Sequence, residues 1–316
     1  MKDLTGFPRG WFAACWSSDL PDDAPRALNY FGKHMALWRD AQGAPVCIDA
    51  YCPHLGAHLA IGGTVVEGRI QCPFHAWEFS GDGRCQHIPY VRNKMPKVPP
   101  NRSWPVVERN GVIFIWHDRD GGSPDWEIPL MDNHGSSDWT PWYENQITVK
   151  THPREIVENV ADSAHFPVVH RTNVDVFENH YEAHMATQHT VGTATPPQGG
   201  VDNFDIRATY YGPAFQYSDM QGYLHSRLFL AHTPVSENEL HLRFAVSLKR
   251  SGPKTEEFAK FYVENLRLGF HEDIEIWENK VFRERPRLCD GDGPIGKLRL
   301  WYSQFYDQKP EARHAP

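Results

Sequence analysis

Short β-strands joined by tight turns are predicted by the hydrophobic pattern of the first third of the chain. Apolar side chains recur at every second position around residues 35–37 and 46–48, on either side of a turn at residues 41–44. Residues 106–114 repeat this arrangement around Asn110-Gly111, a two-residue sequence typical of β-hairpins. We therefore expect an all-β N-terminal domain.

Helices and strands are mixed in the rest of the chain. After Trp116 the apolar alternation stops, and residues 117–124 are polar and rich in turn-forming residues, which predicts a domain boundary near residue 120. Beyond it, residues 154–166 have a helical pattern, residues 205–248 contain strand-like stretches, and residues 255–281 form the clearest helix. The predicted domains are residues 1–120 and residues 121–316, with an α+β fold overall.

The composition of the chain argues against nucleic acid and a membrane span. The net charge is −8 and no long basic run is present, so nucleic acid is not an expected partner. The longest apolar runs, such as residues 111–116, are far shorter than the roughly 20 residues that span a bilayer, and the first residues lack the apolar stretch of a signal peptide. We expect a cytoplasmic protein without a membrane span, in which clustered Cys and His residues serve as metal ligands.

One such cluster consists of two mixed pairs. Cys52-Pro-His54 is followed after 17 residues by Cys72-Pro-Phe-His75. A Rieske [2Fe–2S] cluster needs two cysteines on one iron and two histidines on the other, so each pair would supply one ligand to each iron. The alternative is a structural zinc site, but zinc fingers usually pair Cys with Cys and His with His. The pattern favours the iron–sulfur cluster.

These two loops resemble the Rieske domain of ring-hydroxylating oxygenases. The resemblance rests on Cys52-Pro-His54-Leu-Gly-Ala and Cys72-Pro-Phe-His75-Ala-Trp77. Respiratory-chain Rieske proteins have an additional cysteine in each loop, and Ala57 occupies the first of those positions here. The oxygenase type therefore fits better.

A second metal site is indicated by two histidines in the other domain. Glu158, Asp162 and His165 would share one face of a continuous helix, where solvated polar residues are common. Pro167 disfavours helix at Phe166, so we expect a kink there, and His170 need not lie roughly 140° around the helix from His165. Two histidines at such a break could also be core residues, and a third ligand would decide between the two interpretations. Non-haem Fe(II) oxygenases bind iron through two histidines and one carboxylate and leave the other positions open.

The phase of the helix at residues 255–281 identifies a candidate for the carboxylate. Its apolar stripe includes Leu266 and Trp277, and Asp273 lies roughly 20° and 40° from them around the helix axis. Neighbouring acids such as Glu272 and Glu275 fall roughly 100° or more away, where solvent explains them. An aspartate in a buried stripe needs a partner, so Asp273 is the predicted third ligand, with His165 and His170.

These residues extend the resemblance to the catalytic domain. Three motifs resemble oxygenase components of the 3-ketosteroid 9α-hydroxylase family: Asn159-Val-Ala-Asp162-x-x-His165-x4-His170, Glu272-Asp273-Ile-Glu-Ile-Trp277 and the closing Asp292-Gly-Pro…Trp301-Tyr-Ser-Gln304-Phe-Tyr306. The Rieske stretch, with Ile88-Pro89-Tyr90 after it, is similar to sterol 7-desaturases of the same subfamily. The resemblance implies a helix-grip (START-like) catalytic domain and a small hydrophobic, steroid-like substrate. Five aromatic residues are candidates to line its site: Tyr210, Tyr211, Phe215, Tyr217 and Phe229.

The resemblance also implies a mechanism and partners. A separate ferredoxin or flavin reductase uses NAD(P)H and passes electrons to the Rieske cluster, and Fe(II) activates O2 to hydroxylate or desaturate a C–H bond. No dinucleotide-binding fingerprint follows a strand in this sequence, so NAD(P)H should bind the reductase. In the family, a homotrimer brings each cluster beside the iron of the next subunit. Asp162 matches the aspartate that bridges this junction, and Asn159 matches a residue near the iron.

Three other functions remain open at this point. An oxygenase could hydroxylate or demethylate an aromatic or alkaloid substrate, because the metal motifs do not encode the substrate. A Rieske electron carrier with an appended binding domain would lack the mononuclear iron, against which His165, His170 and Asp273 argue. A zinc-stabilised lipid carrier would bind sterol without chemistry, and the colour of the purified protein would exclude it.

Overall fold

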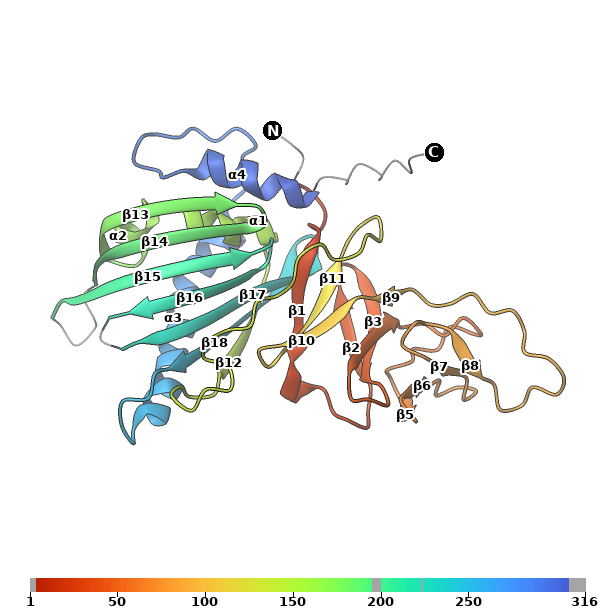
Figure 1. Cartoon of the computed structure of the whole chain (residues 1–316). Coiled ribbons are helices and arrows are strands. Elements are labelled where there is room, and N and C mark those ends of the chain that lie inside the picture. The colour runs from red at the N-terminus through yellow and green to blue at the C-terminus, as the bar shows by residue number, and fades with distance from the viewer. Residues whose placement is uncertain (1–3, 195–199, 223, 307–316) are drawn as a thin grey trace, which may run out of the picture. The chain divides into compact units, whose positions relative to one another are not determined.

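The computed structural model describes residues 4–194, 200–222 and 224–306, and the chain divides into two compact units (Figure 1). The N-terminal unit comprises residues 12–117 and 123–130. The C-terminal unit comprises the described residues of 1–11, 118–122 and 131–316. The chain thus passes between the units more than once around residue 120, and the domain boundary there stays a prediction.

The N-terminal unit is built from short strands, in agreement with the alternation in its sequence. They form three small sheets with the strand orders β1-β11-β10, β2-β3-β4-β9 and β5-β6-β7-β8. The strands are β1 (Gly10–Trp16), β2 (Arg26–Tyr30), β3 (Lys33–Arg39), β4 (Pro45–Asp49), β5 (Thr64–Val66), β6 (Arg69–Gln71), β7 (Glu78–Phe79), β8 (Cys85–His87), β9 (Ser103–Trp104), β10 (Val106–Arg109) and β11 (Val112–His117), with one 3-10 turn at Ser17–Asp19.

Both predicted hairpins are confirmed. Strands β3 and β4 pair in the register Leu37↔Cys47 around the turn at residues 40–44. Strands β10 and β11 are joined by Asn110 and Gly111, whose φ angles of 59° and 78° are the left-handed conformation that a two-residue hairpin turn of type I′ requires. Asparagine and glycine are the residues that tolerate this conformation best.

The C-terminal unit is one seven-stranded antiparallel sheet with helices (Figure 1). Its strand order is β12-β18-β17-β16-β15-β14-β13, so the first strand pairs with the last. The strands are β12 (Tyr143–Val149), β13 (Thr172–Glu182), β14 (Met185–Ala194), β15 (Asp202–Tyr211), β16 (Phe215–Gln221), β17 (Ser226–Ser236) and β18 (Glu239–Leu248). The helices are α1 (Pro153–Glu158), α2 (His165–Val169), α3 (Thr255–Asn279) and α4 (Ile295–Ser303), with 3-10 turns at Asn159–Ala161 and Gln304–Tyr306.

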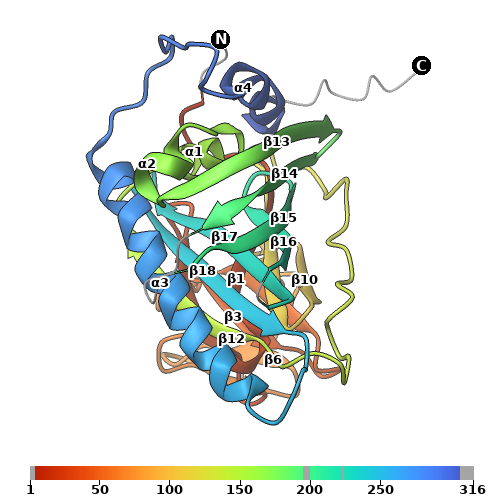
Figure 2. The same cartoon turned by 90° about the vertical axis from the view of Figure 1, so that its left-hand side faces the viewer.

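Helix α3 crosses one face of this sheet and packs against β12 and β18 (Figure 2). The even-numbered residues of β18 from Leu240 to Val246 are fully buried in the same core as Val263, Ile274 and Trp277 of α3. The predicted apolar stripe is therefore confirmed, because a helix buries the side that faces the sheet. The helix ends at Asn279, two residues before the predicted end, where Lys280 takes an extended conformation.

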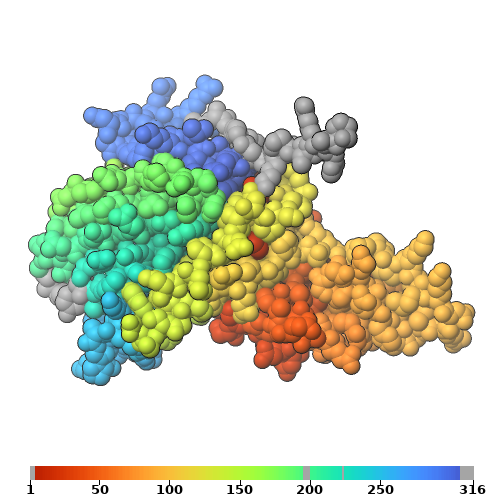
Figure 3. Space-filling view, in the orientation of Figure 1, coloured from red at the N-terminus to blue at the C-terminus, as the bar shows by residue number. Residues whose placement is uncertain are grey.

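Helix α4 lies over the edge of the sheet that β13 and β14 form (Figure 3). The indole of Trp301 donates a hydrogen bond of 3.0 Å to the carbonyl of Ala183 in the turn between these strands. The closing sequence motif thus anchors the C-terminal helix to the sheet. None of the helices within the described ranges is both long and apolar enough to cross a membrane. The helix-grip description of this unit stays a prediction.

Candidate metal centres

Two loops with the same backbone pattern position the predicted cluster ligands in the N-terminal unit. The N–H of Cys52 donates to the carbonyl of Ala57, and the carbonyl of Cys52 accepts from Gly56, both at 2.9 Å. The second loop repeats both bonds: Cys72 donates to Trp77 at 2.7 Å and accepts from Ala76 at 3.0 Å. Gly56 and Ala76, at matching positions, both have positive φ angles. The repeated Cys-Pro sequence therefore builds two equivalent loops.

The two histidine rings of these loops lie close together in an edge-to-face arrangement. The rings of His54 and His75 lie 4.7 Å apart, and His54 stacks on Trp77 at 4.6 Å. Trp77 is held in turn by a hydrogen bond of 2.7 Å from its Nε1 to the hydroxyl of Tyr90. The Nδ1 of His75 is buried and has no hydrogen-bond partner in the described part of the chain. An imidazole nitrogen in this position needs a partner, and a metal ion would supply one.

The two cysteines are buried and close enough to interact. Burial raises the pKa of the Cys52 thiol to about 11, although backbone N–H groups of His54 and Leu55 that donate to its sulfur act in the opposite direction. Iron would supply the positive charge that a buried thiolate requires. Two soft sulfur donors and two imidazoles fit a Rieske cluster by their chemistry and by their arrangement in matched loops.

The histidines of the second site follow a break in the chain that the sequence placed incorrectly. The predicted continuous helix over residues 154–166 is wrong: α1 and its 3-10 turn end at Ala161, and Asp162 is extended. The kink predicted at Phe166 is also wrong, because α2 begins at His165 and contains Phe166. Pro167 is tolerated there because the first turn of a helix does not use its N–H.

The break at Asp162 orients His165. The carboxylate of Asp162 accepts hydrogen bonds from the N–H groups of Ala164 at 3.0 Å and His165 at 3.3 Å, and so starts the turn. Its backbone carbonyl lies 2.8 Å from Nδ1 of His165, which fixes the proton on Nδ1 and leaves Nε2 to bind a metal. Burial alone would raise the pKa of Asp162, but the hydrogen bonds from His165 and Ala164 lower it.

His170 lies between two acidic residues of α3. Its Nε2 is 3.4 Å from Oδ2 of Asp273, and its Nδ1 is 3.5 Å from Oε2 of Glu272. A hydrogen bond to Asp273 raises the pKa of His170, and Glu272 acts in the same direction against the effect of burial. Glu272 is itself paired with Arg171 at 2.9 Å. The helical phase of Glu272 predicts a solvated acid, and only the position of His170 reveals this contact.

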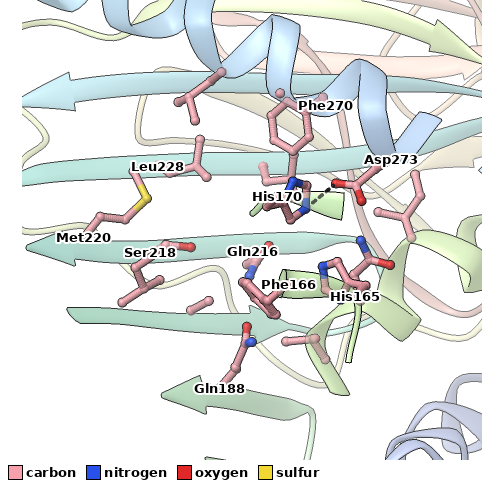
Figure 4. Close-up of a pocket in the computed structure, with 18 of the residues that line it drawn as sticks. His165, Phe166, His170, Gln188, Gln216, Ser218, Met220, Leu228, Phe270 and Asp273 are labelled. Atoms are coloured by element: carbon pink, nitrogen blue, oxygen red, sulfur yellow. Dashed lines mark ion pairs between the residues drawn. The ribbon is translucent and has the colours of Figure 1, made fainter. Parts of the chain in front are cut away.

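His165, His170 and Asp273 come together as a group of three (Figure 4). One potential ligand atom from each lies within 4.8 Å of the other two. The side chain of Asp273 is only 10% exposed, whereas that of Glu272 is 38% exposed, which distinguishes the two candidate acids. Two imidazoles and one carboxylate on one side of a cavity fit the Fe(II) site of non-haem oxygenases.

Replacing Glu272 by glutamine should weaken iron binding by about tenfold, because partners that orient a ligand histidine typically contribute that much. The measurement is iron retained during titration with a chelator. Glu275→Gln is the matched control, since Glu275 is exposed on the same helix. Equal retention by the two variants would contradict a role for Glu272 in orienting His170.

A glycine in the closing motif lies against the break that orients His165. Gly293 has a φ of +79°, and a Cβ atom there would lie 2.3 Å from the carbonyl oxygen of Ala161. Gly293→Ala should therefore lower the free energy of unfolding by about 1–3 kcal/mol, through strain and displacement of the turn. Chemical denaturation measures this. Gly291→Ala is the control, because a Cβ there meets nothing within 4 Å; an equal loss in both variants would contradict the explanation.

A cavity of about 440 Å³ opens onto the three residues (Figure 4). This volume falls in the range of roughly 300–1,000 Å³ that is typical of small-molecule sites. Its lining is mostly apolar and includes Phe166, Phe204, Met220, Leu228, Leu266 and Phe270. Asn159 also lines it, and the side-chain carbonyl of Asn159 accepts a hydrogen bond of 3.2 Å from Trp277.

Of the five aromatic residues expected to line the site, only Tyr210 does so. The sheet alternation explains the difference, because odd-numbered side chains of β15, β16 and β17 point to the face opposite that of the cavity. The even-numbered positions Gln216, Ser218 and Met220 of β16 line it instead. Neither these residues nor Gln188 was predicted from the sequence. The register to Leu228 and Leu230 on β17 would identify the correct face once the pairing is known.

Two protein-family models match this chain, one over each of the regions that contain the two candidate metal centres. Residues 10–105 match the profile of the "Rieske [2Fe-2S] domain". Residues 115–306 match that of the "3-Ketosteroid 9alpha-hydroxylase C-terminal domain". The chain belongs to the 3-ketosteroid 9α-hydroxylase family of Rieske oxygenases. The family resemblance inferred from the metal motifs is therefore confirmed.

Relatives of this oxygenase match along nearly all of its length. It is 35% identical to a 3-ketosteroid-9-alpha-monooxygenase oxygenase component of Rhodococcus rhodochrous, over 96% of this chain and 83% of the relative. The corresponding protein of Mycobacterium tuberculosis is 34% identical, over 97% and 85%. A cholesterol 7-desaturase of Caenorhabditis elegans is 31% identical, over 96% and 77%. The oxygenase is thus an enzyme of the Rieske monooxygenase type, and the term component indicates a separate reductase.

Solved Rieske oxygenases share the fold. A crystal structure of dicamba monooxygenase bound to dicamba has a TM-score of 0.78 and covers 96% of this chain and 98% of its own. The sequence identity is only 21%, so the likeness establishes the fold and no substrate. The two-part α+β architecture expected from the sequence is confirmed.

Proposed function

We propose that this oxygenase inserts one oxygen atom from O2 into a C–H bond of a steroid-like polycycle, with hydroxylation preferred to desaturation. The observation that carries the proposal is the apolar cavity that opens onto His165, His170 and Asp273. Its volume of about 440 Å³ and its mostly apolar lining suit a small apolar molecule. The named activities of the relatives, a 3-ketosteroid 9α-monooxygenase and a cholesterol 7-desaturase, give the substrate class.

The chain's own residues position the reaction. When bound, the mononuclear iron would supply O2 activation and the cluster would supply single electrons. Apolar side chains such as Phe166, Leu228 and Phe270 exclude water and hold the substrate's ring system beside the two histidines. The overall reaction consumes a C–H bond, O2, two electrons and two protons, and yields a C–OH group and water. His165 and His170 present Nε2 while their Nδ1 atoms are held by Asp162 and Glu272.

The proposed cluster ligands are Cys52, His54, Cys72 and His75, and the proposed ligands of the mononuclear iron are His165, His170 and Asp273. The purified protein should be red-brown, with about two cluster irons and two acid-labile sulfides per chain. Visible spectroscopy with iron and sulfide analysis measures this. A colourless protein that holds zinc after anaerobic reconstitution would contradict the cluster assignment.

The proposal also includes the route by which electrons reach the mononuclear iron. A separate ferredoxin or flavin reductase oxidises NAD(P)H, and a homotrimer brings the cluster of one subunit beside the iron site of the next. Asp162 is the proposed link, because its side chain is 36% exposed while its main chain orients His165. Asn159 is proposed to contact the bound substrate or oxygen. The cytoplasmic location and the domain boundary near residue 120 stay predictions from the sequence.

The deciding experiment is a turnover screen. Ketosteroids, sterols and small aromatic acids are incubated with the oxygenase, NADH, O2 and a surrogate reductase, and products are identified by mass spectrometry. A steroid that gains 16 mass units supports the proposal, and a steroid that loses two hydrogens supports the substrate class but replaces hydroxylation by desaturation. Oxidation of aromatic acids alone would overturn the substrate class and leave the metal chemistry unaffected.

A further inference from the structure

A small group of polar side chains lies on the sheet wall of the otherwise apolar cavity. Gln188 on β14 pairs with Ala208 on β15, Ala208 pairs with Ser218 on β16, and Ser218 pairs with Leu228 on β17. These four residues form one row across the sheet, and all four line the cavity. Because Ala208 has the smallest side chain of the row, it leaves space between Gln188 and Ser218.

The side-chain amide nitrogen of Gln188 makes no hydrogen bond within the described part of the chain. The residue is 6% exposed, and this nitrogen is buried. A buried amide that makes no hydrogen bond costs stability, so its retention in an apolar wall requires another explanation. An amide both donates and accepts, and rotation about its last side-chain bond exchanges the two groups. Gln188 can therefore hydrogen-bond to an oxygen atom of a ligand in the cavity.

Gln188 and the proposed iron ligands lie on different sides of the cavity, so a hydrogen bond to Gln188 would orient a ligand relative to the iron site. Figure 4 shows Gln188 rising from β14 on the side of the cavity away from Asp273. A ligand oxygen held by Gln188 would fix one point of a rigid ring system, while the apolar walls confine the rest. The carbon that faces His165 and His170 is then determined by its distance from that oxygen.

We propose that Gln188 positions the substrate by hydrogen-bonding to a ketone or hydroxyl oxygen on its ring system, and so selects which carbon is oxidised. The inference rests on the proposed function, since it names the polar group that the polycyclic substrate carries. It requires an oxygenated polycycle and excludes a pure hydrocarbon as the preferred substrate. Sites built to hydrogen-bond a ligand group reject analogues that lack it.

A cycle of variants and ligands tests the inference. Dissociation constants are measured without reductase for androst-4-ene-3,17-dione and for its two analogues that lack one ketone each, with the wild type and with Gln188→Met. Methionine keeps the length of the side chain but cannot replace the amide. Gln188→Met should reduce the preference for the diketone over one of the two analogues by about three- to tenfold, the effect of one uncharged hydrogen bond. In turnover, the variant should spread oxidation over more than one carbon.

Two further variants separate this effect from general damage. Leu228→Met reshapes the wall in the same row without removing a polar atom, so it should change the binding of the diketone and of both analogues by the same factor. Gln188→Glu should retain part of the preference, since burial keeps the acid protonated and able to donate. Wild-type binding with a preference that Gln188→Met leaves unchanged would overturn the inference alone. Failure of the wild type to bind any steroid would overturn it together with the proposed function.

Discussion

Asp273→Ala is expected to abolish substrate oxidation while leaving the visible spectrum of the Rieske cluster unchanged. The carboxylate lies 3.4 Å from Nε2 of His170 and belongs to the group of three potential ligands whose atoms lie within 4.8 Å of one another. Loss of a group that merely orients a ligand typically costs 10–100-fold in metal affinity or activity. Loss of a ligand should therefore cost at least about a hundredfold, measured as product formed per cluster.

The neighbouring acids provide the controls. Glu275→Ala should retain full activity, because its side chain is exposed on the same helix. Glu272→Ala should retain partial activity, because Glu272 supports His170 from the opposite ring nitrogen. Turnover by Asp273→Ala at a rate close to that of the wild type, together with an inactive Glu272→Ala, would show that Glu272 is the iron ligand.

Sequence alone predicts the site residues whose proposed partners are encoded in local spacing. The pairs Cys52/His54 and Cys72/His75 need only two short loops, and the phase of one helix separates Asp273 from its acidic neighbours. The structure brings His165 and His170 together as predicted, although the reason given for their proximity was wrong. The chain breaks at Asp162 and not at Phe166, because an aspartate that caps the next turn outweighed the proline that this turn tolerates.

Which side chains line the cavity depends on how the strands pair, and the pairing could not be predicted from the sequence. Each strand has two faces, and a shift by one residue exchanges them, so Tyr217 and Ser218 were equally plausible lining residues before the register was known. The pairing of Ser218 with Leu228 decides the question. Gln188 could not be predicted as a lining residue for the same reason. It lies in a strand with several polar residues, and only its burial distinguishes it from the polar residues of that strand that face solvent.

Mixing two inactive variants is expected to restore activity if electrons cross between subunits. Cys72→Ser should lack the cluster and keep the iron site, whereas Asp273→Ala should keep the cluster and lose the iron site. In a ring of three subunits, each junction joins the cluster of one chain to the iron site of the next. With equal amounts of both chains assembled at random, about one junction in four combines an intact cluster with an intact iron site.

Coexpression of the two variants should therefore give about a quarter of the wild-type activity per chain in the unfractionated trimers, and about one third in trimers purified to contain both variants, because one junction in three is intact there. Each variant expressed alone is the baseline, and wild type coexpressed with Cys72→Ser sets the upper reference. Adding Asp162→Asn to the Cys72→Ser chain should slow reoxidation of the reduced cluster in the mixed trimers without loss of either metal, because Asp162 would link the two sites across the junction. Complete inactivity of mixed trimers whose size and metal content are normal would mean that each chain transfers electrons only to its own iron.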